Sequence, residues 1–390
     1  MYPNLKDNKF FGYGLNKNIS SQNVEKMFTH HETGKMINYK VDNDLFLKSS
    51  INNDKQNYIL KIFGGSTSFC TQVNQEDYFF EKSFSQIATQ KDFYYKNYAI
   101  PGHNILHDYN KIKNFNNKVD LNLESVFVFN HGWNEEFANS VFPSALHNVK
   151  PFNAIEINFI YQKNFILSKL CKNPYLATLI RKFTHKRFIR LMNFYGVERW
   201  TNFVNNNYIN FWLYNLEKIF RLIPNKKVII INNPGLAHLS DTSENIDFII
   251  ENSRLNKKYH LYQSLCLEIN SIVNNHIATF FEIPIIDLNL EFKKMNSKKR
   301  LEYFFDEIHF STKGHELISG IMKKNFLNLD LKKIKKIDKK DFNDLKLKII
   351  KDIEVIINIA KREIYKNFSI SKKIYSIPRD RYPSYNFSED

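Results

Sequence analysis

The 390-residue sequence contains few residues that cross-link or interrupt a chain: 3 cysteines, 11 glycines and 10 prolines. Cys70, Cys171 and Cys266 are far apart and form no Cys-x-x-Cys pair, which argues against a disulfide framework and a thiolate zinc site. No apolar run approaches the roughly 20 residues that span a bilayer, and residues 1–7 lack the pattern of a secretory signal. We therefore expect a soluble protein of the reducing cytoplasm.

Negative charge is also scarce, because 40 acidic residues face 56 lysines and arginines and leave a formal charge of +16. The excess of Lys, Asn, Ile and Phe fits a genome rich in A and T. A polyanion or an anionic membrane surface as partner is the alternative interpretation. The content of 43% hydrophobic and 25% charged residues is that of a globular protein and excludes disorder over most of the chain.

Short apolar runs alternate with helical patterns along much of the sequence. Most of these runs end in glycine or Pro-Gly and polar residues, which is typical of strands in one parallel sheet with helices on both faces. We predict strands at 58–63, 93–100, 125–130, 227–232 and 283–288. We predict helices at 76–89, before residue 116, over most of 247–281, and at 311–326 with Ser311 as the cap.

Three regions lie outside this alternation. Residues 1–57 are polar and irregular and are predicted to be an N-terminal lead-in to a catalytic domain at 58–326. Residues from about 150 to 225 are predicted to be a helical insertion, with a basic stretch at 176–194. Residues 327–390 are predicted to be a basic helical extension and a tail. The lysine-rich part at 323–351 is interpreted first as a solvated helix or connector and second as a contact for a polyanion. The insertion and the extension hold the concentrated basic residues.

A serine follows the first predicted strand in the motif Gly64-Gly65-Ser66-Thr67. Glycines allow a tight turn that presents the Ser66 hydroxyl to a cleft and its own N–H to a bound oxyanion. Gly-Gly-Ser is also a common turn, so the motif alone is weak. It is not the Gly-x-Ser-x-Gly elbow, because Ser68 stands where that pattern needs glycine.

The sequence Asp306-Glu-Ile-His309 stands just before the last predicted helix of the domain. A spacing of three residues on one turn lets a carboxylate hold one imidazole nitrogen, which leaves the other nitrogen to act as a base. Such pairs also occur by chance. His315 is nearby on the following helix and is expected to face solvent.

Two further strand ends carry groups suited to acyl chemistry. Gly102 follows the second predicted strand and has an N–H that can approach a substrate closely, and Asn134 follows the third with a side-chain amide. Donors of this kind stabilise a tetrahedral oxyanion, although asparagine is also an ordinary turn former. A parallel sheet would bring these groups together with Ser66, which makes the set more specific than its members.

At these four blocks the sequence resembles the SGNH hydrolases, also called GDSL-type esterases and lipases. The blocks are Gly64-Gly65-Ser66-Thr67, the segment from Asn97 to Gly102, Gly132-Trp133-Asn134, and Asp306-x-x-His309. The resemblance covers about 58–142 and 226–326. It implies a three-layer α/β/α fold with a parallel, five-stranded, flavodoxin-like sheet.

The resemblance also implies roles for the matching residues. Ser66 would be the nucleophile, His309 the general base and Asp306 the residue that orients it. The oxyanion hole would combine the N–H groups of Ser66 and Gly102 with the Asn134 side chain. Thr67, His131, Trp133 and His238 are candidate substrate contacts, and no metal or cofactor is implied.

The sequence departs from the family at a few positions and in one spacing. Gly65 replaces the aspartate of the namesake motif, Thr67 replaces its leucine, and Glu135 stands where aspartate is usual. The first two are common variants and do not touch the catalytic atoms. The long stretch between the third and last blocks supports an inserted cap and puts the shape of the substrate pocket in doubt.

The leading hypothesis is a serine esterase that removes a small acyl group, acetyl by analogy with the family, from a carbohydrate or another small hydroxylated substrate. An O-acyltransferase to a sugar hydroxyl would use the same acyl-enzyme. A basic protein that binds nucleic acid or a membrane surface is the third hypothesis, although no zinc finger, RNA-recognition signature or phosphate loop is present. We expect no specific nucleic-acid partner and at most weak anionic contacts, and the sequence leaves the oligomeric state open.

Overall fold

The computed structural model describes the chain in segments that include all five predicted strands. The described residues are 5–8, 12–15, 33, 37, 58–69, 73–91, 93–115, 124–131, 209–223, 225–252, 257–306, 308–334 and 338–368. Predictions that fall between these ranges lie outside the described residues. They include Gly132, Trp133, Asn134, most of the insertion and the tail.

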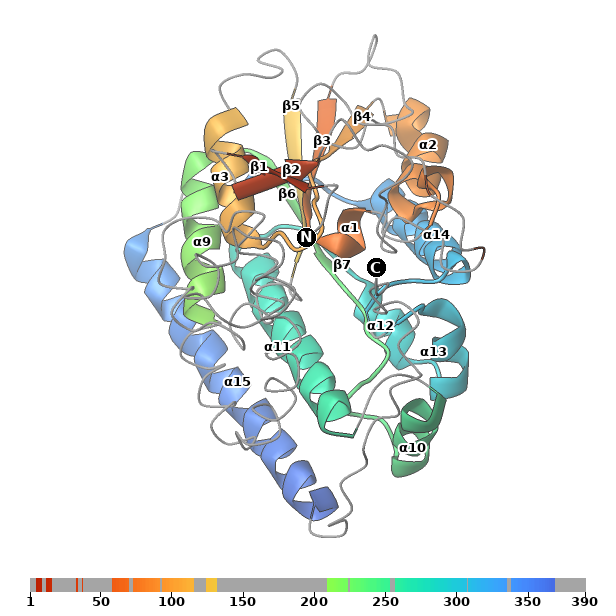
Figure 1. Ribbon diagram of the computed structural model, residues 1–390. Helices are drawn as coiled ribbons and strands as arrows, with labels where there is room; N and C mark the ends of the chain where they lie inside the picture. The colour runs from red at the N-terminus through yellow and green to blue at the C-terminus, as the bar shows by residue number, and fades with distance from the viewer. Residues whose placement is uncertain are drawn as a thin grey trace, which may run out of the picture.

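A five-stranded parallel sheet forms the centre of the molecule (Figure 1). Its order is β4-β3-β5-β6-β7, the flavodoxin-like arrangement, in which the second strand, β4, lies on one side of the first strand, β3, and the later strands follow in order on the other side. The strands are β3 (Tyr58–Gly64), β4 (Phe93–Asn97), β5 (Glu124–Asn130), β6 (Lys227–Asn232) and β7 (Ile285–Asp287). The predicted sheet and its three-layer class are thus confirmed, with β4 and β7 shorter than expected.

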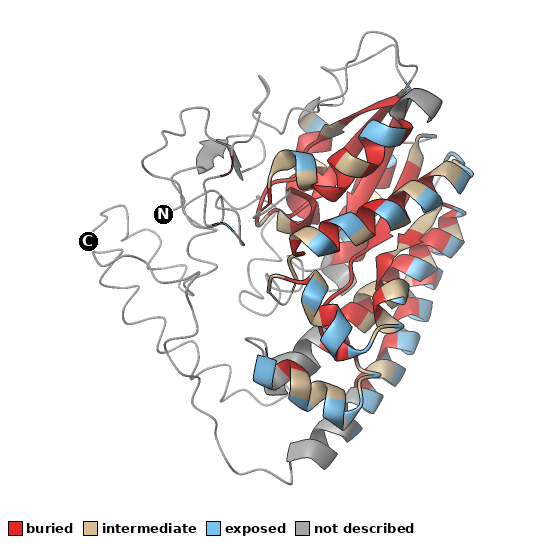
Figure 2. Ribbon diagram, turned by 90° about the vertical axis from the view of Figure 1, so that its right-hand side faces the viewer, coloured by how far each residue is buried: buried red, intermediate tan, exposed pale blue. Residues whose placement is uncertain are grey.

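Two apolar cores lie on opposite faces of this sheet because successive strand residues point to opposite sides. Phe127, Phe129 and Ile230 belong to one core, whereas Val126 and Ile229 belong to the other. In Figure 2 the strands are mostly buried, and buried and exposed residues alternate along the helices. The alternation of side chains along the strands explains why strands buried on both faces appear in the sequence as continuous apolar runs.

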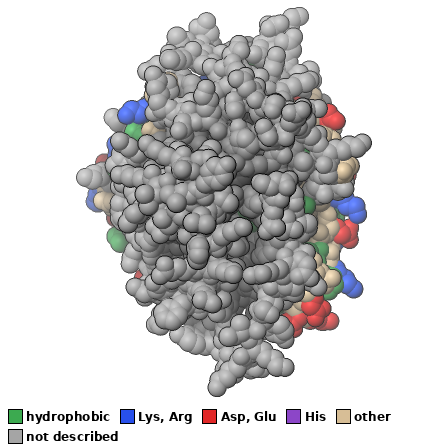
Figure 3. All heavy atoms as spheres, in the orientation of Figure 1, with side chains coloured by type: hydrophobic (Ala, Val, Ile, Leu, Met, Phe, Trp, Pro, Cys, Tyr) green, Lys and Arg blue, Asp and Glu red, His purple; other side chains and the backbone are tan. Residues whose placement is uncertain are grey.

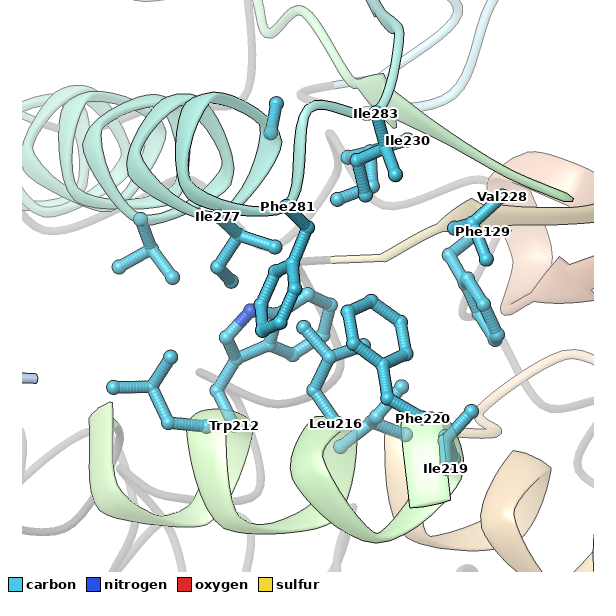
Figure 4. Packing of buried hydrophobic residues seen from close by; sticks show 14 of the residues in the cluster. Phe129, Trp212, Leu216, Ile219, Phe220, Val228, Ile230, Ile277, Phe281 and Ile283 are labelled. Carbon is cyan, nitrogen blue, oxygen red and sulfur yellow. The ribbon is translucent and has the colours of Figure 1, made fainter. Parts of the chain in front are cut away.

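One face is covered by α3 (Ile105–Phe115), α9 (Ile209–Leu222) and α11 (Lys257–Phe281). In Figure 4, Trp212 and Phe220 of α9 point toward Ile277 and Phe281 of α11. The rings of Phe220 and Phe281 meet edge to face at 4.9 Å. The predicted insertion therefore contributes at least α9 to the main core.

The other face is covered mainly by α1 (Ser66–Phe69), α2 (Phe79–Lys91), α12 (Leu288–Lys293) and α14 (Thr312–Asn328). A short 3₁₀ turn, η2 (Gln75–Asp77), leads into α2, and α10 (Ser243–Asn252) and α13 (Ser297–Tyr303) pack against each other. Ser311 caps α14 as predicted, since its side chain accepts the Gly314 N–H at 3.2 Å.

The C-terminal helix α15 (Lys339–Phe368) packs against α11 and completes the first core (Figure 1). The structure corrects the expectation of a solvated extension, because Phe342, Leu345, Ile349 and Ile353 are buried in that core. These residues recur every three or four positions and form one apolar stripe. Lys340, Lys348 and Lys351 lie on the exposed side of the helix.

A small antiparallel hairpin was not predicted within the N-terminal lead-in. It pairs β1 (Leu5–Asn8) with β2 (Gly12–Leu15), and Leu5 lies opposite Leu15. The strands are only four residues long and lack a continuous apolar run, so their signal in the sequence is weak.

Basic and acidic side chains lie close to one another on the visible margin of the described surface (Figure 3). Lys313 and Glu302 are an exposed ion pair, with Nζ and the carboxylate oxygen 3.3 Å apart. Among the described residues, none of the helices combines the length and the hydropathy needed to cross a membrane. The same part of the chain contains no group of three or more His, Cys, Asp or Glu side chains arranged to hold a metal ion.

Candidate active site

Ser66 begins the single-turn helix α1 directly after β3 and Gly65. A side chain at Gly64 would place its Cβ 2.6 Å from the Asn130 carbonyl oxygen and 2.3 Å from the Ser68 hydroxyl. Only glycine therefore lets β3 run so close to β5 at this point. The tight packing holds the turn that presents Ser66 at the carboxyl end of the sheet.

The same turn is fixed from the other side through the carbonyl group of Ser68. This carbonyl accepts a hydrogen bond from Asn97 Nδ2 at 2.7 Å and another from the Tyr78 hydroxyl. The Asn97 side chain is itself oriented, because its Oδ1 accepts the Ala99 N–H at 2.9 Å. Asn97 begins the second of the four sequence blocks, but no role of its own was predicted for it from the sequence.

Asp306 and His309 lie in a narrow loop between α13 and α14. A bridge between Phe304 and Phe310 closes the loop, and the Phe305 N–H donates to the His309 carbonyl at 2.8 Å. Inside it, Asp306 Oδ1 accepts the N–H groups of Ile308 and His309 at 2.9 and 2.7 Å. The Asx-type turn explains how a spacing of three residues brings carboxylate and imidazole together.

A chain of two hydrogen bonds joins Asp306, His309 and Ser66 although 243 residues separate His309 from Ser66. Asp306 Oδ2 is 2.7 Å from His309 Nδ1, and His309 Nε2 is 2.7 Å from the Ser66 hydroxyl oxygen. The His309 and Asp306 side chains are 16% and 12% exposed, so they are sheltered yet within reach of solvent. The structure thus brings together the three residues that the first and last motifs singled out.

The electrostatics of the chain favour an ionised Asp306. Burial by itself would raise the pKa of this carboxyl, but the charge of His309 and hydrogen bonds from His309 and two backbone N–H groups lower the pKa below its ordinary value. A carboxylate at Nδ1 favours the tautomer with its proton there, which makes Nε2 the acceptor for the serine proton. The arrangement can therefore deprotonate Ser66 as it attacks an electrophilic carbon.

Gly102 lies in a turn beside the serine turn. The His103 N–H donates to the Ile100 carbonyl at 3.0 Å across Pro101 and Gly102, and Gly102 has a φ of 80°. Proline followed by a residue of positive φ is the pattern of a type II turn, in which the second position favours glycine. The Ile100 N–H donates to the Gly64 carbonyl at 3.3 Å, which places this turn next to Ser66.

The remaining candidates have different positions. Asn134 and Trp133 are outside the described residues, so their predicted roles stay predictions. Thr67 and His238 are buried, and the His238 N–H donates to Asp241 Oδ2 at 2.8 Å. His131 is buried and hydrogen bonded to Asp108, an interior position that differs from the expected lining of a cleft.

The expectation that His315 faces solvent is wrong. The residue is 2% exposed, and its ring stacks on Phe79 at 5.7 Å and meets Phe310 edge to face at 5.6 Å. The start of α14 turns this side chain inward against α2, as the aromatic contacts show. His315 is therefore a packing residue beneath the loop that carries His309.

The search of known proteins found likeness only among solved structures. No protein-family model and no curated protein matches the chain. A lipolytic protein of the G-D-S-L family from Veillonella parvula is 13% identical, with coverage of 70% of this chain and 100% of its own and a TM-score of 0.39. An acetyl xylan esterase, AlAXEase, is 13% identical with coverage of 68% and 98% and a TM-score of 0.39. A lipase/acylhydrolase from Enterococcus faecalis is 15% identical with coverage of 69% and 95% and a TM-score of 0.35. These structures therefore do not assign an activity to the chain, and its activity is inferred from the geometry of the site.

Proposed function

We propose that the chain is a serine ester hydrolase of the SGNH type. The observation that carries the proposal is the hydrogen-bond chain from Asp306 through His309 to the Ser66 hydroxyl, with both heavy-atom distances at 2.7 Å. Activation of a serine by an imidazole that a carboxylate orients is the arrangement of acyl-transfer enzymes on several unrelated folds. Its place at the carboxyl ends of parallel strands is where such sheets carry their ligands.

In the proposed reaction His309 Nε2 takes the Ser66 proton while Ser66 Oγ bonds to the ester carbonyl carbon. The carbonyl oxygen becomes an oxyanion, stabilised by the N–H groups of Ser66 and Gly102 and by the Asn134 side chain. Collapse of this intermediate breaks the bond to the alcohol oxygen, which receives the proton from His309. Water then attacks the acyl-enzyme in the same way and releases the acid.

The proposed substrate is an ester of a small acyl group, acetyl first, on a carbohydrate or similar hydroxylated alcohol. The support for this finer assignment is the resemblance of the four sequence blocks to the SGNH hydrolases. Turnover of a panel of p-nitrophenyl esters of increasing chain length, followed by acetylated sugars, tests it. Acyl preference is shown by kcat/KM, which falls with chain length if the proposal holds.

The decisive experiment is labelling with a fluorophosphonate, which reacts with activated serines, followed by peptide sequencing that separates Ser66 from Ser68. We expect the label on Ser66, and loss of both label and p-nitrophenyl acetate hydrolysis in Ser66→Ala. Ser85→Ala is the matched control, because Ser85 is an exposed serine on α2. Normal hydrolysis by Ser66→Ala would disprove the mechanism.

A further inference from the structure

A second group of titratable side chains lies inside the protein, where the proposed reaction does not use it. Asp108 on α3 holds Lys111 Nζ at 2.5 Å with one carboxylate oxygen and the His131 ring with the other. The side chains of Asp108 and Lys111 are 0% exposed and that of His131 is 1% exposed. Lys111 Nζ also donates to the Tyr98 carbonyl at 2.7 Å. We call these three side chains the Asp108 network.

The network contacts the chain at two places that lead into the proposed oxyanion hole. Tyr98 is the first residue after β4 and precedes the turn that carries Gly102. His131 is the first residue after β5 and stands three positions before Asn134. These strands lie on either side of β3, and the Asp108 carboxylate contacts His131 directly and the Tyr98 carbonyl through Lys111.

The helix that carries Asp108 is itself fixed next to the Gly102 turn. Asn104 Oδ1 accepts the Leu106 N–H at 3.1 Å and lies 2.7 Å from His107 Nδ1. The His131 ring is held on its other side by Trp212 of α9, with ring centroids 5.7 Å apart. Asp108 therefore has a defined position, from which it can fix the residues that directly follow β4 and β5.

From these contacts we propose that Asp108, Lys111 and His131 are positioning residues that fix the chain at Tyr98, just before the Gly102 turn, and at His131, where β5 ends, an inference that rests on the proposed function. A buried ion pair adds little stability over apolar residues of similar volume. Apolar side chains could pack α3 against the sheet equally well. Apolar side chains could not fix the positions of the Tyr98 carbonyl and the His131 ring, whereas charge-assisted hydrogen bonds have a preferred direction and do so.

Burial by itself would raise the pKa of the Asp108 carboxyl, but the charges of Lys111 and His131 and the hydrogen bonds from both lower that pKa. Asp108 is therefore ionised near neutral pH. Catalysis is sensitive to such alignment, since a displacement of 1 Å at the reacting atoms can cost about 10²-fold in rate. The network is thus suited to hold the turn that carries Gly102, whose N–H is a proposed oxyanion donor, although none of the three network side chains is such a donor.

The test uses His131→Leu, which removes the ring's hydrogen bond, and His131→Gln, which keeps an N–H donor of similar reach. We expect kcat for p-nitrophenyl acetate to fall about 10-fold to 10²-fold in His131→Leu while KM changes less than about 2-fold. His131→Gln should recover most of the loss. The inhibition constant of a boronic acid, which forms a tetrahedral adduct with the serine, should rise in parallel with the fall in kcat/KM.

Folding is controlled in two ways. The double variant Asp108→Asn/Lys111→Met removes both full charges together, so it leaves no unpaired buried ion, and we expect the same loss in kcat. Asp352→Asn breaks the pair between His276 and Asp352, 2.7 Å apart on α11 and α15, and should leave kcat unchanged. Thermal unfolding of every variant separates loss of fold from loss of alignment.

Wild-type kcat and boronic acid affinity in both His131→Leu and the double variant would overturn the inference and leave the proposed function standing. A wild-type protein that neither hydrolyses esters nor reacts with the fluorophosphonate would overturn the proposed function, and with it the role of the network. A lowered unfolding temperature with normal kcat would show that the network only stabilises the fold, which also contradicts the inference.

Discussion

Two aspartate–histidine pairs at the same edge of the sheet have the same chemical groups and different surroundings. In the pair of Asp306 and His309 the side chains are 12% and 16% exposed, and the second imidazole nitrogen meets the Ser66 hydroxyl. In the pair of Asp108 and His131 they are 0% and 1% exposed, and the carboxylate is shared with Lys111. The pairing alone therefore does not define a catalytic group.

The third partner and the access of solvent distinguish the two pairs. In the first pair the Ser66 hydroxyl can donate its proton to the second imidazole nitrogen of His309, and partial exposure lets a substrate approach. In the other pair the Lys111 ammonium binds the Asp108 carboxylate and keeps it in place, because separating two buried charges costs much free energy. The first pair is suited to move a proton and the second to hold a position.

Replacing the base should produce the largest effect. We expect His309→Asn to lower kcat for p-nitrophenyl acetate by on the order of 10⁴-fold to 10⁶-fold, since a serine without its base is a weak nucleophile. His276→Asn is the matched control, because His276 also pairs with an aspartate, but its partner is Asp352 of α15 and not a residue of the loop that carries His309. A His309→Asn protein that keeps a tenth of wild-type kcat would remove His309 from the mechanism.

Replacing the carboxylate of the same pair should come next. Asp306→Asn keeps the shape of the turn and loses the charge that holds the Nδ1 proton, so we expect kcat to fall by about 10⁴-fold. The steady-state rate and the rate of fluorophosphonate labelling should fall together, as both require an activated Ser66. Unaltered labelling would show that Asp306 only shapes the loop.

Breaking the interior pair should affect stability first. Lys111→Met leaves Asp108 buried without its ammonium, and we expect the free energy of unfolding to fall by about 3–5 kcal/mol. The double variant Asp108→Asn/Lys111→Met should regain much of this loss. Urea unfolding at neutral pH measures both values, and equal losses in the single and double variants would contradict the account of an unpaired charge.

Acid should weaken both pairs in the same direction. The pKa values of Asp306 and Asp108 are lowered in the folded protein, so each carboxylate stabilises the fold above the ordinary carboxyl pKa and loses that effect as pH falls toward its own lowered value. Each contributes a slope of up to about 1.4 kcal/mol per pH unit in that window. Unfolding free energies below about pH 4 should fall less steeply in the double variant than in the wild type. Parallel curves would show that Asp108 is not ionised in the fold.

The sequence indicated the pair that we propose to be catalytic and not the interior pair, because of how far apart the partners lie along the chain. Asp306 and His309 are three residues apart, so local spacing reveals them, and the apolar runs before Gly64 and Gly102 reveal where Ser66 and its neighbours lie. Asp108 and Lys111 are also three apart, but on a helix this looks like an ordinary surface pair. Only the sheet topology, which brings residues 23 positions apart together, shows that His131 completes the group.

The errors in the prediction have the same origin in tertiary contact. The many lysines around α15 favoured a solvated helix, although its apolar residues form a stripe. The sequence around His315 does not show that its ring packs against Phe79 and Phe310. In contrast, the five strands were found because burial on both faces leaves continuous apolar runs that need no partner to be seen. Local patterns thus predicted the scaffold and the catalytic motifs, whereas long-range packing decided the rest.

A third aspartate–histidine pair should give the smallest effect and so sharpen the comparison. His276 and Asp352 are 2.7 Å apart like the catalytic pair, but their side chains are 20% and 51% exposed. Water and ions screen such a pair, so we expect Asp352→Asn to change the free energy of unfolding by about 0.2–1 kcal/mol. Added salt should reduce even this difference, while it leaves the loss in Lys111→Met unchanged. A larger, salt-independent loss in Asp352→Asn would show that α15 depends on this contact, and that exposure alone does not rank the three pairs.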